Sequence, residues 1–519
     1  MSNTVWRWTR NFTVMKHHRH SIIVFLLALA YALSTAWFGV NFYDEGIIVT
    51  GGMRVLHGDI PHRDFASLYP YASYYISAAI QFVFGNGLLP FRLCAAIVFA
   101  GLCTLSYLFM IRMGLPPLYA ILCCITLLLW TGIAPITLRA VFLSLFCTLL
   151  SLYVITGTYK HKYSISYLLL LSASIMRWDI ALYGSIAWGV YRTVSDVFVW
   201  RKLLFTIVIV SLSVVLFPLF TLWAFSGETA TIKAIEQTII FPVFEFPSVR
   251  GLPFPLFFPR WHDESKADVL LASFALWGMI IVIIAAHVQW LTRKISFNAP
   301  NHRIALTLFV FMIGLMNQAR VRSDFEHCVP ALFPFFILIF TYISLKNLPK
   351  KNISIITLCL ISMPVALKGK QWFQTILYSP YREMWGNGIY DRNAQSYDSL
   401  VHFIQKKTSI HDRILMCPQQ GQSNQSSDIF FYYAAQRIPV TYFHEFHPGI
   451  TDKDDAQKQI INDCRHNNCR FIIRQNLKTN SSPRKPQSSP TTILDTFITN
   501  NYYTVCTIRD YTVMIPKQR

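Results

Sequence analysis

Two adjacent acids, Asp44 and Glu45, follow the first long apolar run of the chain, at the point where that run would leave a membrane. A carboxylate at a membrane surface can accept a proton from an attacking hydroxyl or amine, or it can hold a divalent cation. The alternative is that both acids favour the N-terminus of the next helix, by capping or through the helix dipole. The sequence makes Asp44 and Glu45 the candidate catalytic residues.

The segment after these acids carries many polar side chains at short spacing. Its arginines and acids pair equally well with one another at the surface, where such pairs contribute little to stability. Six of its residues are therefore candidates for an acceptor site or cavity wall, with surface pairing as the alternative: Arg54, His57, Asp59, Arg63, Asp64 and Tyr69.

Composition indicates which elements position these residues. Of 519 residues, 53% are hydrophobic and only 14% are charged, against roughly a quarter charged in soluble domains. The apolar residues form separate runs of about 17 to 22 residues, enough for a helix to cross a bilayer. The net charge of +20 comes from short Lys/Arg clusters between these runs rather than from one basic face, so no nucleic-acid partner is expected. The sequence predicts a polytopic α-helical membrane protein.

The distribution of Lys and Arg predicts the orientation. With the basic segment 1–20 in the cytoplasm, every predicted inside loop is basic, as the positive-inside rule requires. The long segments 41–89 and 224–267 are then outside, and the Pro-rich second one is expected to cover a cleft or to act as an ordered plug. The membrane domain is placed at 21–369, with about eleven spans: 21–39, 90–111, 117–134, 138–156, 164–177, 179–191, 203–223, 268–289, 303–319, 329–345 and 352–367.

Residues 370–519 have the composition of a soluble domain, and an odd number of spans places it on the non-cytoplasmic side. Alternating strand and helix patterns predict a small α/β domain. Thr451 is the expected cap of one of its helices. The predicted helices are 393–407, 427–436, 452–467 and 493–500, and the predicted strands are 413–417, 440–443, 470–474, 503–508 and 512–515.

The first outside loop resembles a known enzyme family. In order, it carries Asp44-Glu45-Gly46, then Arg54-Val55-Leu56, Gly58-Asp59-Ile60-Pro61, Arg63-Asp64-Phe65 and Tyr69-Pro70-Tyr71. This order is similar to that of the GT-C superfamily of polyprenyl-phosphate-sugar glycosyltransferases, and most similar to its bacterial branch of protein mannosyltransferase-like and aminoarabinose transferase-like enzymes. The resemblance implies transfer of a sugar from a polyprenyl-phosphate donor to a glycan, lipid or protein acceptor outside the membrane, with inversion and with Asp44 near the reaction centre.

A second polar cluster suits such a donor. Arg320, Arg322 and His327 lie at the outer end of the ninth predicted span, where the positive-inside rule disfavours arginine. Arginine binds phosphate oxygens with paired hydrogen bonds. These three are the candidate donor-phosphate residues, and Asp324 is expected to orient them or to contact the sugar. The alternative is that the arginines snorkel to the headgroups or pair with Asp324. Arg139 and Arg177 also lie near outer span ends, but each stands alone and a structural role is favoured for both.

No residue pattern predicts a resident cofactor with certainty. A divalent cation is possible at Asp44, but the second outside turn, 132–138, lacks the acid that some relatives place there. The His444-Glu445-Phe446-His447 cluster lacks zinc-helix spacing, and Pro448 stops a helix there. A ligase or polymerase of lipid-linked glycans, a transporter or flippase, and a scaffold remain as alternative functions. The style of the motif favours a bacterial inner membrane, with undecaprenyl phosphate as carrier.

Overall fold

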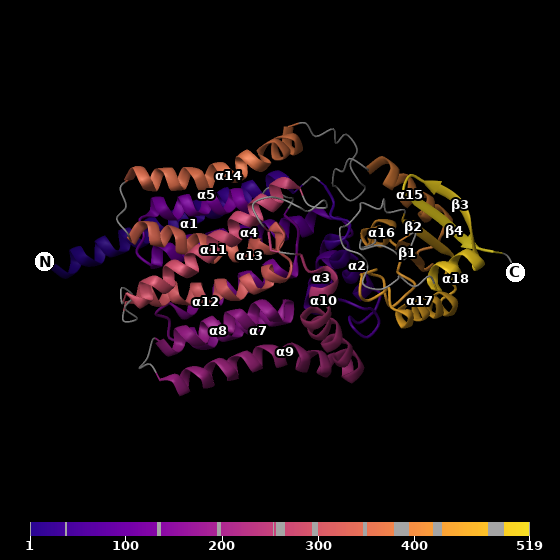
Figure 1. Cartoon of the computed structure of the whole chain (residues 1–519), viewed down its shortest axis with the longest axis horizontal. Coiled ribbons are helices and arrows are strands. Elements are labelled where there is room, and N and C mark those ends of the chain that lie inside the picture. The colour runs from indigo at the N-terminus through magenta and orange to yellow at the C-terminus, as the bar shows by residue number, and fades with distance from the viewer. Residues whose placement is uncertain are drawn as a thin grey trace.

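A computed structural model shows a long helical bundle with a small mixed domain at one end (Figure 1). It describes residues 2–36, 39–131, 136–194, 199–252, 254–255, 265–292, 299–345, 350–377, 394–418, 428–475 and 493–517. The N-terminus lies at the far end of the bundle and the C-terminus beyond the sheet. Helices α2, α3 and α10 lie between the bundle and the C-terminal domain.

Each of the eleven predicted spans falls on a helix of the bundle. Five described helices are long and apolar enough to cross a membrane, and several others are apolar but shorter. An integral membrane protein is therefore confirmed, while the number of crossings stays a prediction. The bundle helices are α1 (Ser2–Thr35), α4 (Leu89–Arg112), α5 (Pro117–Thr131), α6 (Ala140–Ile155), α7 (Lys162–Met176), α8 (Trp178–Val194), α9 (Trp200–Ile235), α11 (Lys266–Leu291), α12 (Pro300–Val321), α13 (Phe325–Leu345) and α14 (Lys350–Leu377).

The segment predicted as the loop 224–267 is largely helical. Helix α9 continues past the predicted end of its span to Ile235, and a π-helix η1 (Glu236–Glu245) and the short helix α10 (Phe246–Arg250) follow it. The chain bends at Gly227, whose φ of 82° lies in the left-handed region that glycine adopts without strain. Prolines in this stretch hid its helical character. Residues 256–264 lie outside the described part of the chain.

Helices α2 (Asp44–Leu56) and α3 (Ala72–Phe84) form the first outer loop. They pack very closely because α2 presents two glycines to α3. A Cβ added at Gly51 would lie 2.2 Å from Cδ1 of Tyr74, and one added at Gly52 would lie 2.2 Å from Oγ of Ser77.

The C-terminal domain has a four-stranded sheet in the order β1-β2-β4-β3, with β1 parallel to β2 and the other pairs antiparallel. The predicted strand 440–443 is wrong, since only an isolated bridge between Pro439 and Ile414 forms there. The expected cap Thr451 is also wrong, because α17 is capped by Lys453 and the Thr451 hydroxyl donates to the carbonyl of His447. The elements are α15 (Ala394–Lys407), β1 (Ile414–Pro418), α16 (Phe430–Ala435), α17 (Asp454–His466), β2 (Phe471–Gln475), α18 (Ile493–Asn501), β3 (Tyr502–Ile508) and β4 (Tyr511–Pro516).

The C-terminal domain is docked directly on α2. A Cβ at Gly46 would lie 2.4 Å from the backbone nitrogen of Phe430, so the two backbones touch at this point. The Phe430 N–H donates to the carbonyl of Phe42 at 3.0 Å, and the Thr50 hydroxyl donates to that of Ile429 at 3.0 Å. The helix that begins with the candidate catalytic acids is thus held between the bundle and the soluble domain.

Candidate functional site

Asp44 lies in the first turn of α2, and Asn41 organises that turn. The Asn41 side-chain oxygen accepts hydrogen bonds from the backbone N–H groups of Tyr43 and Asp44, at 3.2 and 2.8 Å. Its amide nitrogen donates to Oδ2 of Asp44 at 3.0 Å. Capping by Asp44 or Glu45 was the alternative reading of the sequence. Asn41 caps this turn, and Glu45 takes part by accepting a hydrogen bond from the Asn41 backbone N–H at 3.0 Å, whereas within the described part of the chain the Asp44 carboxylate makes no such bond.

Arg139 joins Asp44 to a second acid, Glu326. Its guanidinium lies 3.2 Å from Oδ2 of Asp44 and 2.9 Å from Oε2 of Glu326. Arg139 has extended backbone just before α6, whereas Glu326 lies in the first turn of α13, so three segments distant in sequence meet here. The Arg139 and Asp44 side chains are 24% and 25% exposed, so a ligand can reach this ion pair. Among the described residues, Oδ1 of Asp44 accepts no hydrogen bond.

Tyr69 and Arg177 extend this cluster. Burial, together with the charges of Asp44 and Glu445, raises the pKa of the half-buried Tyr69, while Arg177 and Arg139 oppose that rise. The phenol therefore stays protonated and remains a hydrogen-bond donor. Arg177 donates to Asp179 at 2.9 Å, and the side-chain amide of Gln318 lies against its guanidinium.

The cluster continues to Arg320 at the end of α12. Arg320 donates to the side-chain oxygen of Asn317 at 3.3 Å, and the Asn317 amide donates to the Tyr183 hydroxyl at 3.2 Å. Tyr183 also lies within electrostatic range of Arg177 and Arg320. Within the described residues, Arg320 forms no salt bridge, and its side chain is exposed. Its charge is therefore open to an anion.

The other two basic residues predicted to bind phosphate are both bound to one buried acid, Asp324. Arg322 and His327 each bind Asp324 at 2.6 Å, through different carboxylate oxygens. Burial alone would raise the pKa of Asp324, but the neighbouring His327 and Arg322 charges hold it well below its usual range. Arg322 is thus paired with Asp324, as the alternative interpretation expected, and the same carboxylate fixes the orientation of His327.

Glu45 has a different environment from its neighbour. Its two oxygens accept hydrogen bonds from Nε and Nη2 of Arg92 at 2.7 and 2.6 Å, and the Arg92 and Glu45 side chains are 0% and 3% exposed. Arg92 also donates to the carbonyls of Ala36 and Gly39. This arrangement ties the end of α1 to α2 and α4. It favours a role for Glu45 in positioning the turn that carries Asp44.

Most of the predicted cavity-wall residues pair with one another or with backbone groups rather than with Asp44. Arg54 is buried and bonds Asp59 at 2.7 Å and the carbonyls of Asp64 and Thr441 at 2.9 Å. Arg63 forms an exposed pair with Asp64 at 2.8 Å. His57 is exposed and bonds its own helix backbone. Of the six candidates, Tyr69 is the one that the structure brings to Asp44.

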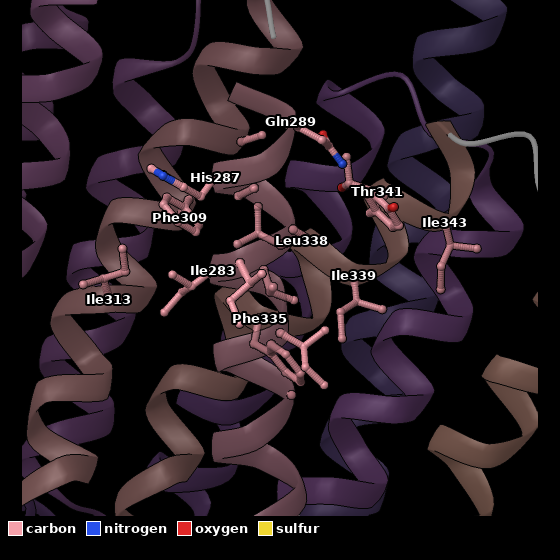
Figure 2. A pocket seen from close by; sticks show the side chains of 18 of the residues that line it. Ile283, His287, Gln289, Phe309, Ile313, Phe335, Leu338, Ile339, Thr341 and Ile343 are labelled. Atoms are coloured by element: carbon pink, nitrogen blue, oxygen red, sulfur yellow. The ribbon is translucent and has the colours of Figure 1, made fainter. Parts of the chain in front are cut away.

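An apolar cavity of about 1200 Å³ lies between α11, α12, α13 and α14. Figure 2 shows His287, Gln289 and Thr341 toward one end and Phe335 toward the other. Trp130 of α5 also lines the cavity, and its ring lies 6.2 Å from that of Phe325, the neighbour of Glu326. Trp130 therefore lies between the cavity and the first turn of α13, which carries Glu326.

No family model matches the chain, and no curated protein matches its sequence. Three solved structures are similar to it. ArnT from Cupriavidus metallidurans bound to undecaprenyl phosphate aligns with a TM-score of 0.53 and 13% identity, over 99% of this chain and 98% of that chain. The same protein in the apo state gives 0.51 and 13%, over 98% of both chains. Arabinofuranosyltransferase AftD from Mycobacteria gives 0.48 and 11%, over 96% of this chain and 40% of that chain.

The whole chain thus has the fold of ArnT. This confirms the expected polytopic helical membrane fold with a C-terminal α/β domain. In the described part of the chain, no group of three His, Cys, Asp or Glu side chains is placed to hold a metal ion.

Sequence reasoning underrated two residues of the site and missed two more. Arg139 and Arg177 were weighed as lone arginines, yet both lie in the cluster around Asp44 and Tyr69. Glu326 and Asn41 were not singled out. Their position at the ends of apolar runs was the available signal, because polar residues at the same membrane depth on different spans can meet.

Proposed function

We propose that this protein is a membrane glycosyltransferase that moves a sugar from a polyprenyl-phosphate carrier to an acceptor outside the cytoplasm. One observation carries the proposal: a reachable Asp44–Arg139 ion pair lies at one end of a helical bundle that encloses an apolar cavity of about 1200 Å³. Support comes from the fold, which is that of ArnT, and that neighbour's structure contains undecaprenyl phosphate.

The donor's two chemical parts match the two parts of this site. A polyprenyl tail is a long apolar chain, which suits the apolar cavity between α11 and α14. Its phosphate would meet Arg320 and Arg139 at the outer end. A phosphate competes well with the exposed Glu326 for Arg139, because guanidinium binds phosphate oxygens with two parallel hydrogen bonds. Arg322 and His327, oriented by Asp324, are the further proposed phosphate ligands.

Asp44 acts as the proposed base or as the group that orients the acceptor. Once the donor phosphate engages Arg139, Asp44 can accept the proton of an acceptor hydroxyl or amine. The acceptor atom then forms its bond to the anomeric carbon as the bond to the phosphate oxygen breaks, which inverts that carbon. Arginine stabilises the charge that develops on the departing phosphate. A bound divalent cation at Asp44 would assist the same charge neutralisation.

The proposed cellular placement follows the charge distribution. The basic segment 1–20 is cytoplasmic, the membrane domain spans 21–369, and residues 370–519 form the periplasmic domain of a bacterial inner-membrane protein. The structure extends α14 to Leu377, somewhat past that boundary.

Mass spectrometry of lipids and envelope glycans tests the proposed activity. Three strains are compared: one with the native protein, one without it, and one with Asp44→Asn at equal membrane abundance. We expect the loss of one fixed sugar mass from the same acceptor in both altered strains. Glycans unchanged in all three, with transfer also absent in membranes supplied with polyprenyl-phosphate sugars, would refute the function.

A further inference from the structure

The C-terminal domain inserts one acidic side chain into the wall of the site. The segment 441–447 enters the first outer loop, and Glu445 on it is only 5% exposed. The hydroxyl of Tyr43 donates a hydrogen bond to Oε1 of Glu445. Tyr43 immediately precedes Asp44, so a residue from the soluble domain is connected to the turn that carries the proposed base.

Glu445 also lies close to the outer side of the site. Its charge acts on the phenol of Tyr69, on which Asp44, Arg139 and Arg177 act as well. Tyr69 is therefore within electrostatic range of both the soluble-domain carboxylate and Asp44.

The insertion does not depend on Glu445 for its attachment. The preceding residue of the segment, His444, faces Arg54. The Arg54 guanidinium lies 3.4 Å from Nδ1 of His444. The Ala66 N–H donates to the carbonyl of Tyr442 at 3.0 Å, and the Tyr442 hydroxyl donates to that of His62 at 2.9 Å. These bonds hold the segment in place and fix the position of Glu445 beside Tyr43.

We propose that Glu445 is a positioning residue of the transferase site, which it completes from the C-terminal domain. By accepting the Tyr43 hydrogen bond, it fixes the first turn of α2 and thereby the direction of Asp44. The inference rests on the proposed function, since it assigns Glu445 to that same site. It makes the soluble domain part of the site, whereas the sequence left the role of this domain open.

Single-turnover transfer from a polyprenyl-phosphate sugar by the full-length protein tests this inference. We expect Glu445→Ala and Tyr43→Phe each to lower the transfer rate about 10- to 100-fold, the range for losing a hydrogen bond to a charged group. Donor KM should stay within about twofold, because the phosphate is held by arginines elsewhere. Glu445→Gln keeps an acceptor oxygen and should recover most of the rate. The double variant Tyr43→Phe/Glu445→Ala should be no slower than Glu445→Ala, since both remove the same bond.

Glu245→Ala is the matched control. Glu245 also joins the C-terminal domain to the rest of the chain, through Lys453 at 2.7 Å, but it lies in η1 with 43% exposure. Its loss should leave the transfer rate unchanged. Rates for Glu445→Ala and Tyr43→Phe equal to that of Glu245→Ala, or effects that add in the double variant, would overturn the proposal.

Hydrogen exchange separates this inference from the proposed function. Amide exchange of residues 41–47 should be faster in Glu445→Ala than in Glu245→Ala and the native protein, even if no sugar transfer is detected. Unchanged exchange would overturn the positioning role. If the native protein transfers no sugar but Glu445→Ala still exchanges faster than the native protein, the function is refuted and the role of Glu445 in fixing this turn is kept.

Discussion

Asp44 and Glu45 are neighbours in the first turn of α2, yet their carboxylates lie in two different environments. Glu45 is 3% exposed and both of its oxygens are bound by Arg92. Asp44 is 25% exposed and meets Arg139 through one oxygen. Successive side chains on a helix point about 100° apart, so adjacent acids can face the bundle and the site separately.

The two arginines differ in the same way. Arg92 has a buried guanidinium that also bonds two backbone carbonyls. Loss of Glu45 as its partner would therefore leave the Arg92 charge unpaired in an apolar interior. Arg139 shares its charge between Asp44 and the 56% exposed Glu326. An ion pair that water reaches can exchange one anion for another at low cost. The Arg92–Glu45 pair therefore suits a structural role, and the Arg139–Asp44 pair suits ligand binding.

Asp44→Asn gives the largest expected effect on activity. The amide cannot accept the acceptor's proton, so the transfer rate should fall about 10²- to 10⁴-fold. The free energy of unfolding should change by less than about 1 kcal/mol, because the lost ion pair is partly exposed. Transfer assays and thermal unfolding in detergent measure the two quantities. A rate near that of the native protein would remove Asp44 from the mechanism.

Arg92→Met tests the other half of the comparison. It leaves Glu45 buried without its guanidinium, and we expect a loss of about 3–5 kcal/mol in stability. Arg92→Met/Glu45→Met should recover much of that loss, because no charge then remains unpaired. Thermal midpoints and membrane abundance report the change. If Arg92→Met were as stable as the native protein, the distinction between the two pairs would be wrong.

Asp428 has a buried carboxylate that contacts no arginine among the described residues. It is 2% exposed and accepts hydrogen bonds from the Tyr511 hydroxyl at 2.9 Å and the Phe431 N–H at 3.2 Å. Burial raises its pKa to about 7, while bonds from Tyr397 and Tyr511 limit the rise. The folded state thus binds more protons than the unfolded state between about pH 4 and 7, so this group's contribution to stability falls as pH rises through that window.

Asp428→Asn should abolish that dependence. Between pH 5 and pH 8, the native protein should lose about 2 kcal/mol more stability than the variant. Thermal midpoints of the full-length protein at both pH values give the difference. Parallel pH profiles would show that Asp428 is ionised in the folded protein throughout this range.

The smallest expected effects are those of substitutions at Arg320 and Arg322. Arg320 meets only the neutral Asn317 among its described contacts, whereas Arg322 is bound to Asp324. We expect Arg320→Ala to raise donor KM about tenfold through the loss of a charge-assisted hydrogen bond to phosphate. Arg322→Ala should chiefly lower stability, because Asp324 loses a partner. Equal donor KM values for Arg320→Ala and the native protein would exclude Arg320 from phosphate binding.

Local sequence patterns were enough for most of the fold. Apolar runs located a helix at each predicted span, and period-two and helical patterns located most elements of the C-terminal domain. The failures have local causes. Prolines hid the helical character of residues 224–250. Residues 440–443 form no strand because Val440 packs in the core of the C-terminal domain while Tyr442 bonds Ala66 and His62 of the first loop.

The sequence by itself determined the membrane character of the chain and the presence of Asp44 and Arg320 at helix ends, because both follow from hydropathy and charge along the chain. Only the tertiary structure decided that Glu45 faces Arg92, that Arg139 and Glu326 meet Asp44, and that Glu445 reaches Tyr43. These partners are distant in sequence. Their pairing depends on helix rotation and on how the soluble domain docks, and periodicity along one chain does not encode either.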